Sequence, residues 1–230
     1  MNSASVYCLR PFTNLHVGSG ESNFGVVDNL IQRDPATGLP CIHASGLKGA
    51  IKQLCGYKGM EKGMLKEIFG SDADVNAKGA KQKDAQQGQA FFMSAQLYAI
   101  AQPMEQRPYQ RVTCTAVQNL FQQFLQDLNC NTAIKIGFAD VDAISDAQFI
   151  ELCDNMNLPV IARNALDNGE SVNLWYEQVL PRESLLYFAI LWEKEEHKKA
   201  LEAILLNSPL QVGGNASVGY GFTKVTLCQP

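Results

Sequence analysis

Segments with a two-residue hydrophobic period and segments with a helical period alternate irregularly along this chain of 230 residues. Extended patterns predict strands at 4–15, 30–32, 89–101, 133–138, 158–162, 172–179, 185–192 and 217–227. Helical patterns predict helices from Ser45 onward and at 61–69, 115–128, 143–155 and 194–206. A doubly wound parallel sheet needs regular strand–helix alternation, so this order predicts an α+β fold.

Side-chain positions can be predicted in two of these segments. Ser45 is predicted as the N-cap of its helix, because a serine side chain can accept a hydrogen bond from the first helical turn. The strand at 89–101 is predicted to place Phe91, Met93, Ala95 and Leu97 on one face. Residues 71–88 are polar and lack a period, so we expect a mobile insertion loop within a single domain over 1–230.

Composition excludes several classes of protein. Hydrophobic residues make up 46%, which is too many for a disordered chain. No run of about 18 apolar residues predicts a membrane span, and residues 1–5 lack the pattern of a signal peptide. The seven cysteines are odd in number and form no C-x-x-C pair, so we expect reduced thiols in a cytoplasmic protein.

Charge is distributed unevenly along the chain. The formal net charge of −4 argues weakly against a general nucleic-acid binder. Residues 1–83 contain 10 Lys and Arg against 7 Asp and Glu, whereas residues 84–230 contain 9 against 16. The net charges are therefore +3 and −7, so an anionic ligand is expected to prefer the first third of the chain.

Three segments could bind an anion. Two are glycine loops, at 18–20 and 213–221, and neither matches a P-loop. The third is the helix start at 45–49, where free N–H groups attract phosphate and where Lys48 and Lys52 share one face. His16 and Asp28 flank the first glycine loop and could act as acid or base. Taken singly, the glycine loops and these two side chains are more often structural.

The order of these segments resembles that of the RAMP superfamily in type III CRISPR effectors, in particular the backbone ribonuclease subunit of the Cmr (type III-B) complex. The matching stretches are 16–20 (HVGSG), 25–34 (GVVDNLIQRD), 37–40 (TGLP), 45–50 (SGLKGA), 68–70 (IFG), 111–114 (RVTC), 158–164 (LPVIARN), 173–177 (NLWYE) and 212–221 (VGGNASVGYG). Each stretch alone is weak, but the ordered set is specific and runs nearly end to end.

The resemblance implies a modified RRM-like (ferredoxin-like) palm with insertions. It implies copies that stack along a CRISPR RNA beside other Cmr subunits and cleave the paired target single-stranded RNA at regular intervals. Asp28 matches the cleavage aspartate and is the expected ligand of Mg²⁺ or Mn²⁺, and His16 matches a histidine of the same loop. Tyr176 and Glu177 are weaker catalytic candidates. The residues expected to contact RNA are Gly18, Ser19, Gly20, Ser45, Lys48, Lys52, Arg163, Gly213, Gly214, Gly219, Tyr220 and Gly221.

The chemistry is compatible with this reading. RNA supplies its own nucleophile, the 2′-hydroxyl, so one loop carboxylate could serve as base or metal ligand. Base pairing carries the sequence information, so the protein needs only a few backbone contacts, and stacking of copies multiplies them despite the net negative charge.

The sequence departs from the family in two places. The chain is shorter than usual members, so the family's thumb hairpin is expected to be reduced or relocated, and the segment 93–97 (MSAQL) lacks the usual Asp and Arg.

Three alternatives remain open from the sequence. The first is a non-cleaving RNA-binding subunit of the same superfamily. The second is the equivalent subunit of a Csm (type III-A) complex. The third, from a different class, is a small-molecule phosphate-binding enzyme that uses both glycine loops.

Overall fold

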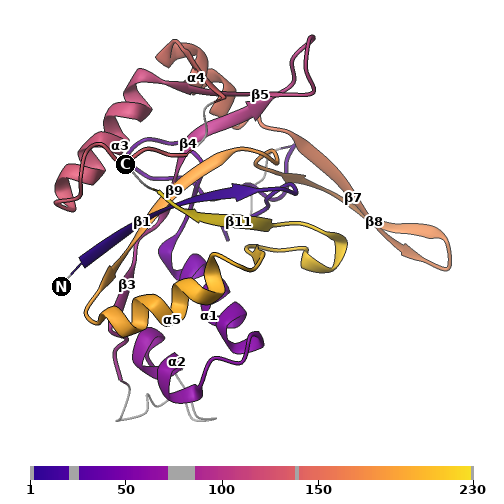
Figure 1. Cartoon of the computed structure of the whole chain (residues 1–230). Helices are drawn as coiled ribbons and strands as arrows, with labels where there is room; N and C mark the ends of the chain where they lie inside the picture. The colour runs from indigo at the N-terminus through magenta and orange to yellow at the C-terminus, as the bar shows by residue number, and fades with distance from the viewer. Residues whose placement is uncertain (1–2, 21–25, 72–85, 138–139, 229–230) are drawn as a thin grey trace.

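The computed structural model of the chain describes residues 3–20, 26–71, 86–137 and 140–228. Its centre is a mixed sheet with the strand order β10-β11-β1-β9-β4-β5-β6 (Figure 1). The strands are β1 (Ser3–Pro11), β2 (Cys41–Ile42), β3 (Ala90–Phe92), β4 (Ala95–Gln102), β5 (Gln110–Cys114), β6 (Val141–Ile144), β9 (Leu185–Trp192), β10 (Leu210–Gln211) and β11 (Phe222–Leu227). The helices are α1 (Ala44–Tyr57), α2 (Lys62–Phe69), α3 (Thr115–Asp127), α4 (Asp146–Cys153) and α5 (Glu195–Leu205).

Four antiparallel strands form the middle of the sheet, in the order β11-β1-β9-β4. Along the chain these strands and two of the helices follow the sequence β1, α1, β4, β9, α5, β11. This is the β-α-β-β-α-β arrangement of a ferredoxin-like fold. The structure therefore confirms the predicted α+β class and the RRM-like palm.

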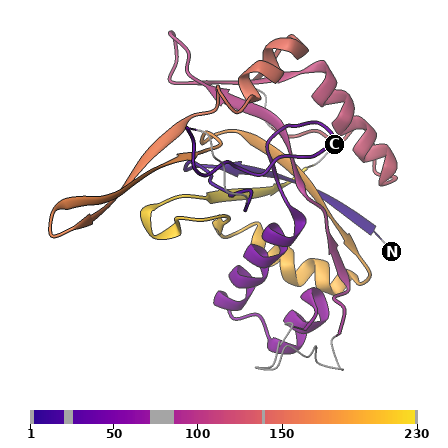
Figure 2. The ribbon, with the colours of Figure 1, turned by 180° about the vertical axis from the view of Figure 1, so that it is seen from behind.

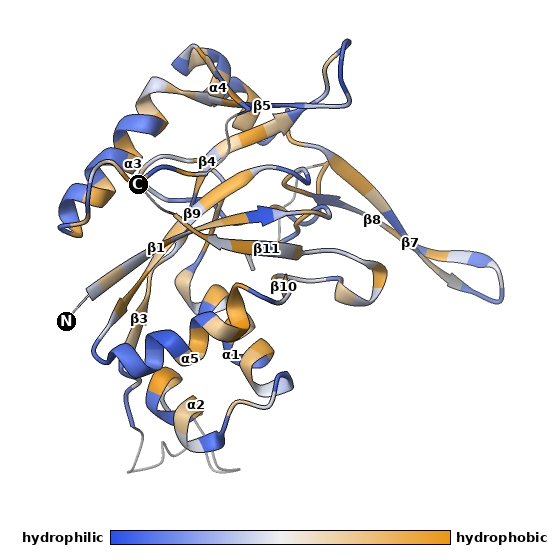
Figure 3. Cartoon of the chain, in the orientation of Figure 1, coloured by the Kyte–Doolittle hydropathy of each residue, from blue (hydrophilic) through white to orange (hydrophobic). Residues whose placement is uncertain are grey.

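Helices cover the two faces of the sheet (Figures 1 and 2). Tyr7 and Leu9 of β1 point into a core with residues of α1 and α5, while Val6 and Cys8 point into a second core with α3. Because both faces of β1 and β9 are buried, β9 is apolar along nearly its whole length (Figure 3). Each fully buried large side chain contributes about 1.5–3 kcal/mol to folding.

The strand predicted at 89–101 is broken in the structure. β3 pairs with β9 through Ala90–Phe92, and β4 resumes pairing with the same strand only after Met93 and Ser94. The irregular step changes which residues share a face, so Met93 packs in the second core while Ala95 and Leu97 pack in the first. The predicted common face of Phe91, Met93, Ala95 and Leu97 is therefore wrong.

Three further sequence expectations are corrected. No strand is assigned in the described part, 133–137, of the segment predicted as a strand at 133–138; the side chain and carbonyl of Asn131 accept hydrogen bonds from Ala133 and Ile134, so the chain turns there. Phe138 lies outside the described residues. The helix predicted at 143–155 begins later, because Ser145 forms a capping box with Gln148.

The last strand, predicted at 217–227, begins only at Phe222. A short 3₁₀ turn, Ala216–Val218, occupies the preceding residues. β5 and β6 form a parallel pair that the sequence patterns did not predict. Residues 111–114, which make up most of β5, are one of the stretches that resemble the RAMP superfamily.

A two-stranded hairpin projects from the body of the molecule (Figures 1 and 2). Its strands, β7 (Val160–Asp167) and β8 (Glu170–Gln178), pair only with each other as a sheet. Asn168 and Gly169 both have positive φ, as the tight turns of hairpins require. The strands predicted at 158–162 and 172–179 are thus present, and both extend further toward the tip.

Several global expectations can be compared with the structure. None of the seven cysteines forms a disulfide in the structure, and all except Cys130 are buried. Most of the loop predicted at 71–88 lies outside the described residues. No helix within the described part of the chain is long and apolar enough to cross a membrane.

Candidate nucleic-acid interface

Asp28 lies against the base of the hairpin. Its Oδ2 accepts a hydrogen bond from the backbone N–H of Tyr176 at 2.8 Å, and its own N–H donates to the Tyr176 carbonyl at 3.1 Å. Asn29 donates to the same carbonyl and accepts from Gln178, so this segment runs beside β8 like a short extra strand. The carboxylate is exposed to solvent and keeps one oxygen, Oδ1, without a described hydrogen bond.

His16 is buried between β8 and the second glycine loop. Its Nδ1 lies 2.7 Å from the carbonyl oxygen of Gln178. A carbonyl can only accept, so Nδ1 must carry the proton, and Nε2 is the ring nitrogen that remains for chemistry. Nε2 faces Gly18, where an added Cβ would lie 3.4 Å away. The glycine therefore leaves this edge of the imidazole open.

The second glycine loop is seated on the backbone of His16. Gly214 donates its N–H to the His16 carbonyl at 2.9 Å. Gly213 has φ +83°, and a Cβ there would collide with the same carbonyl. A Cβ at Gly221, with φ +75°, would collide with the carbonyl of Val212. Both glycines are thus required by close backbone packing.

Glu177 connects the hairpin to this glycine loop. The carboxylate is buried and accepts from Trp175 Nε1 at 2.9 Å and from Asn215 Nδ2 at 2.7 Å. Arg163 on the paired strand lies 3.8 Å from it, and the guanidinium of Arg163 stacks over the ring of Tyr220 at 5.3 Å. Because both of its oxygens are hydrogen-bonded, Glu177 is suited to holding the hairpin rather than to taking a proton.

The first glycine loop is joined to the start of α1 by one side chain. Gln32 donates to the Gly18 carbonyl at 3.2 Å and accepts from the N–H of His43 at 2.7 Å. The N-cap of α1 is His43, so the prediction that Ser45 caps the helix is wrong. Ser45 instead lies exposed in the first turn, and Ser94 satisfies the N–H of Ala44.

Lys48 and Lys52 lie farther along α1. The ammonium of Lys48 is above the ring of Phe92, 5.8 Å from its centroid. Partial burial, together with the neighbouring Lys52, lowers the pKa of Lys48. No described contact joins Lys48 to the glycine loops.

The structure therefore assembles most of the predicted site residues into one strip, defined as His16, Gly18, Asp28, Glu177 and the loop 213–221. Sequence reasoning missed the groups that hold the strip together: the side chains of Gln32, Trp175 and Asn215 and the backbone carbonyl of Gln178. Three of them, Gln32, Trp175 and Asn215, stand inside the quoted stretches, but nothing in the sequence marks their long-range partners. Ser19 and Gly20 follow Gly18 in the first glycine loop. No described atom lies within 4 Å of a Cβ added at Gly20, so close packing does not require this glycine.

The few oxygen ligands around Asp28 limit how a metal ion could bind there. Among the described residues, no three His, Cys, Asp or Glu side chains cluster as metal ligands. A Mg²⁺ or Mn²⁺ ion would have one protein ligand, Asp28 Oδ1, and its remaining ligands would be RNA phosphate oxygens and water. Mg²⁺ sites of this kind, with one carboxylate and substrate phosphates, are common.

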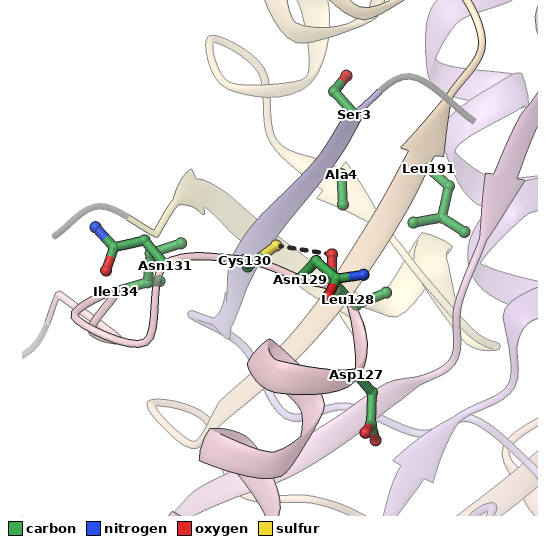
Figure 4. A pocket seen from close by; sticks show the side chains of 9 residues that line it. All are labelled: Ser3, Ala4, Asp127, Leu128, Asn129, Cys130, Asn131, Ile134 and Leu191. Carbon is green, nitrogen blue, oxygen red and sulfur yellow. Dashed lines mark hydrogen bonds between the residues drawn. The ribbon is translucent and has the colours of Figure 1, made fainter.

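One cavity lies away from the strip, at the start of β1 (Figure 4). It measures about 550 Å³ and is lined by residues of β1 and β9, by Asp127 at the end of α3, and by the segment that follows, including Asn129 and Cys130. None of the predicted site residues lines it.

The fold and the strip define a ferredoxin-like protein whose C-terminal glycine loop closes over the residues that follow the first strand. The family model of the RAMP superfamily matches residues 9–224, and the chain therefore belongs to that superfamily. It is 25% identical to the CRISPR system Cmr endoribonuclease Cmr4 of Pyrococcus furiosus, with 95% of this chain and 94% of the relative covered.

Solved structures show the same fold. Oligomeric Cmr4 from Pyrococcus furiosus superposes with a TM-score of 0.71 at 21% identity, covering 99% of this chain and 98% of that one. A chain of the type III-B Cmr-beta complex bound to cognate target RNA superposes with a TM-score of 0.76 at 20% identity, covering 97% and 96%.

Proposed function

We propose that this chain is a backbone subunit of a type III-B (Cmr) effector and an endoribonuclease that acts within the assembled complex. It binds CRISPR RNA beside copies of itself and other Cmr subunits, and it cleaves the paired target RNA. The observation that carries the proposal is the strip, where the hairpin base bonds to Asp28 and to His16 and the glycine loop packs on the backbone of His16. The likeness to Cmr4 over 95% of the chain supports the assignment to the Cmr branch.

The chemistry requires little of the protein. The RNA 2′-hydroxyl loses its proton and attacks the adjacent phosphorus, the bond to the 5′-oxygen breaks, and that oxygen takes up a proton. In the proposed reaction Asp28 Oδ1 would accept the first proton and His16 Nε2 would assist proton transfer. In the alternative role, Asp28 Oδ1 would hold a divalent ion, which would neutralise phosphate charge, and would then not act as the base. The products would carry a 2′,3′-cyclic phosphate and a 5′-hydroxyl.

The β7–β8 hairpin is the candidate for the family's thumb. It projects from the palm, and the Glu177 contacts fix its base beside the strip. In this position it could separate consecutive segments of bound RNA.

A non-cleaving subunit is the second candidate, because one oxygen of Asp28 is already engaged by the N–H of Tyr176. A carboxylate with this bond is a weaker base, since hydrogen bonding favours its ionised form.

Assembly tests the backbone role. We expect guide RNA to convert the protein into larger species of regular stoichiometry, and high salt to reverse this. The net charges of +3 over 1–83 and −7 over 84–230 favour head-to-tail stacking of copies, which screening weakens. Size exclusion with light scattering measures it. A closed dimer whose mass guide RNA leaves unchanged would contradict the proposal.

Lys48→Ala tests the contact of α1 with RNA. We expect weaker guide binding that is independent of sequence, with the salt slope reduced by about 0.7 in log K per log salt, as for one lost phosphate contact. Lys62→Ala, an exposed lysine on α2, is the matched control. An unchanged slope in a fluorescence anisotropy titration removes Lys48 from the phosphate contacts.

His16→Asn tests the role of the imidazole. The asparagine amide can donate to Gln178 as Nδ1 does but has nothing at the position of Nε2, so we expect a folded protein that cleaves about tenfold more slowly. His43→Asn, at the N-cap of α1, is the control histidine. Equal single-turnover rates for His16→Asn and the wild type would exclude proton transfer by His16.

A further inference from the structure

A charged cavity of about 580 Å³ lies on the same side of the sheet as α3, and no residue of α3 lines it. Arg10 of β1 lines it, and by strand alternation this side chain shares a face with Val6 and Cys8. Lys224 and Thr226 of β11 line it as well. None of the strip residues contributes to this cavity, so it is a separate site.

Two cations face each other across the strands in this cavity. Arg10 and Lys224 are direct partners in the β1–β11 register. Like charges directly opposite each other destabilise a sheet. Glu183 neutralises Arg10 through Nη1, at 2.7 and 2.8 Å, but Lys224 has no hydrogen-bond or ion-pair partner in the described part of the chain. The lining also includes Arg111 and Asp140, which form an ion pair, so among the described residues three cations face two carboxylates and one positive charge is left over.

Glu183 and Arg111 hold Arg10 in place at the wall of the cavity. Glu183 has φ +71°, a strained value for a residue with a side chain, and its N–H donates to Pro11 at 2.6 Å. Arg111, only 5% exposed, donates to the carbonyl of Glu183 at 2.7 Å and to its carboxylate at 2.6 Å. Burial opposes ionisation of Glu183, but the bonds and charges of Arg10 and Arg111 outweigh it and lower its pKa.

The edge of Arg10 that does not face Glu183 is available. Only Nη1 bonds to Glu183, and no described residue accepts from Nε or Nη2. That edge of a guanidinium presents two parallel N–H groups that match two oxygens of a phosphate. Lys224 supplies a further charged donor from the neighbouring strand, and Thr226 places a hydroxyl on the same wall.

We propose that this cavity binds a phosphate group, with Arg10 and Lys224 as its charged donors. A cavity of this size accepts a nucleotide as readily as an isolated phosphate. The phosphate belongs either to a free nucleotide or to an RNA backbone outside the strip. A carboxylate from a second copy is the less fitting occupant, because it offers two oxygens to a larger set of donors.

Lys224→Met is the test variant, because it removes the charge and keeps the aliphatic stem. Lys199→Met, an exposed lysine on α5, is the matched control. Inorganic phosphate should raise the melting temperature of the wild type and of Lys199→Met above that in chloride at equal ionic strength, since ligands of the native state stabilise it. Calorimetry should give phosphate binding at least about tenfold weaker for Lys224→Met. Equal effects of phosphate and chloride, or undiminished binding by Lys224→Met, overturn the proposal.

Two further arms identify the source of the phosphate. If Lys224→Met lowers the salt slope of single-stranded RNA binding by about 0.7, the site takes an RNA phosphate. If it weakens binding of adenosine monophosphate and leaves the RNA slope unchanged, the site takes a free nucleotide. Self-association lost in Lys224→Met, with no response to phosphate, assigns the cavity to a second copy and refutes the proposal. Asp28→Asn should leave phosphate binding here unchanged, so failure of this site and failure of the cleavage assignment are distinguishable.

Discussion

Replacing Asp28 with Asn is expected to slow target RNA cleavage at least about 100-fold, the lower range of acid–base contributions, while guide binding stays intact. The asparagine carbonyl can still accept the N–H of Tyr176, so the anchor of the hairpin base survives. Only the negative charge and the basic oxygen are lost. Single-turnover cleavage by the guide-loaded complex, with labelled target RNA, measures the effect.

Two comparisons sharpen this experiment. Glu170→Gln removes an exposed carboxylate near the hairpin tip and should cleave like the wild type. Asp28→Ala removes both the charge and the bond to Tyr176, so any additional loss relative to Asp28→Asn reports the structural share. A rate for Asp28→Asn within a few fold of the wild type would exclude Asp28 from catalysis, whereas absence of cleavage by the wild type would favour the non-cleaving subunit.

Gly213→Ala is expected to cost at least about 3 kcal/mol of the free energy of unfolding. The new Cβ would collide with the carbonyl oxygen of His16, and φ at +83° is unfavourable for alanine. Because the obstacle is backbone, relief requires the loop to move away from His16. Loss of the Gly214–His16 hydrogen bond and of RNA binding should follow.

Gly219→Ala is the matched control for this substitution. Its φ of +88° is nearly the same, but an added Cβ there meets nothing within 4 Å. The loss in the free energy of unfolding should then come only from the left-handed conformation and amount to about 1–2 kcal/mol. Urea unfolding of both variants separates the two contributions, and equal losses would show that the contact with His16 is not tight.

Strong hydrophobic periodicity explains which elements the sequence could predict. The strand at 185–192 agrees with β9 at both ends, and the helix at 115–128 differs from α3 by one residue. The break between β3 and β4 was missed because it depends on how Met93 and Ser94 meet β9 and α1. The parallel pair of β5 and β6 was missed because its partners are joined through α3, with little periodicity of their own.

The site was predictable in its composition and not in its geometry. Asp28, His16 and the second glycine loop were found through ordered stretches that resemble a family. The bond between Asp28 and Tyr176 spans 148 positions of the chain, and that between His16 and Gln178 spans 162. Contacts at such separations arise from the fold, so no local pattern records which oxygen of Asp28 is left for chemistry.

Within the described part of the chain, no third strand pairs with the hairpin β7–β8 beyond its base. Two-stranded ribbons are marginal in water by themselves, so its order must decay from the Glu177 anchor toward the Asn168–Gly169 turn. The free energy of local opening should therefore fall along its length, with slow amide exchange near Gln178 and fast exchange at the tip. A hairpin that is rigid at its base and flexible at its tip can adapt to an irregular surface while its base stays in a fixed position.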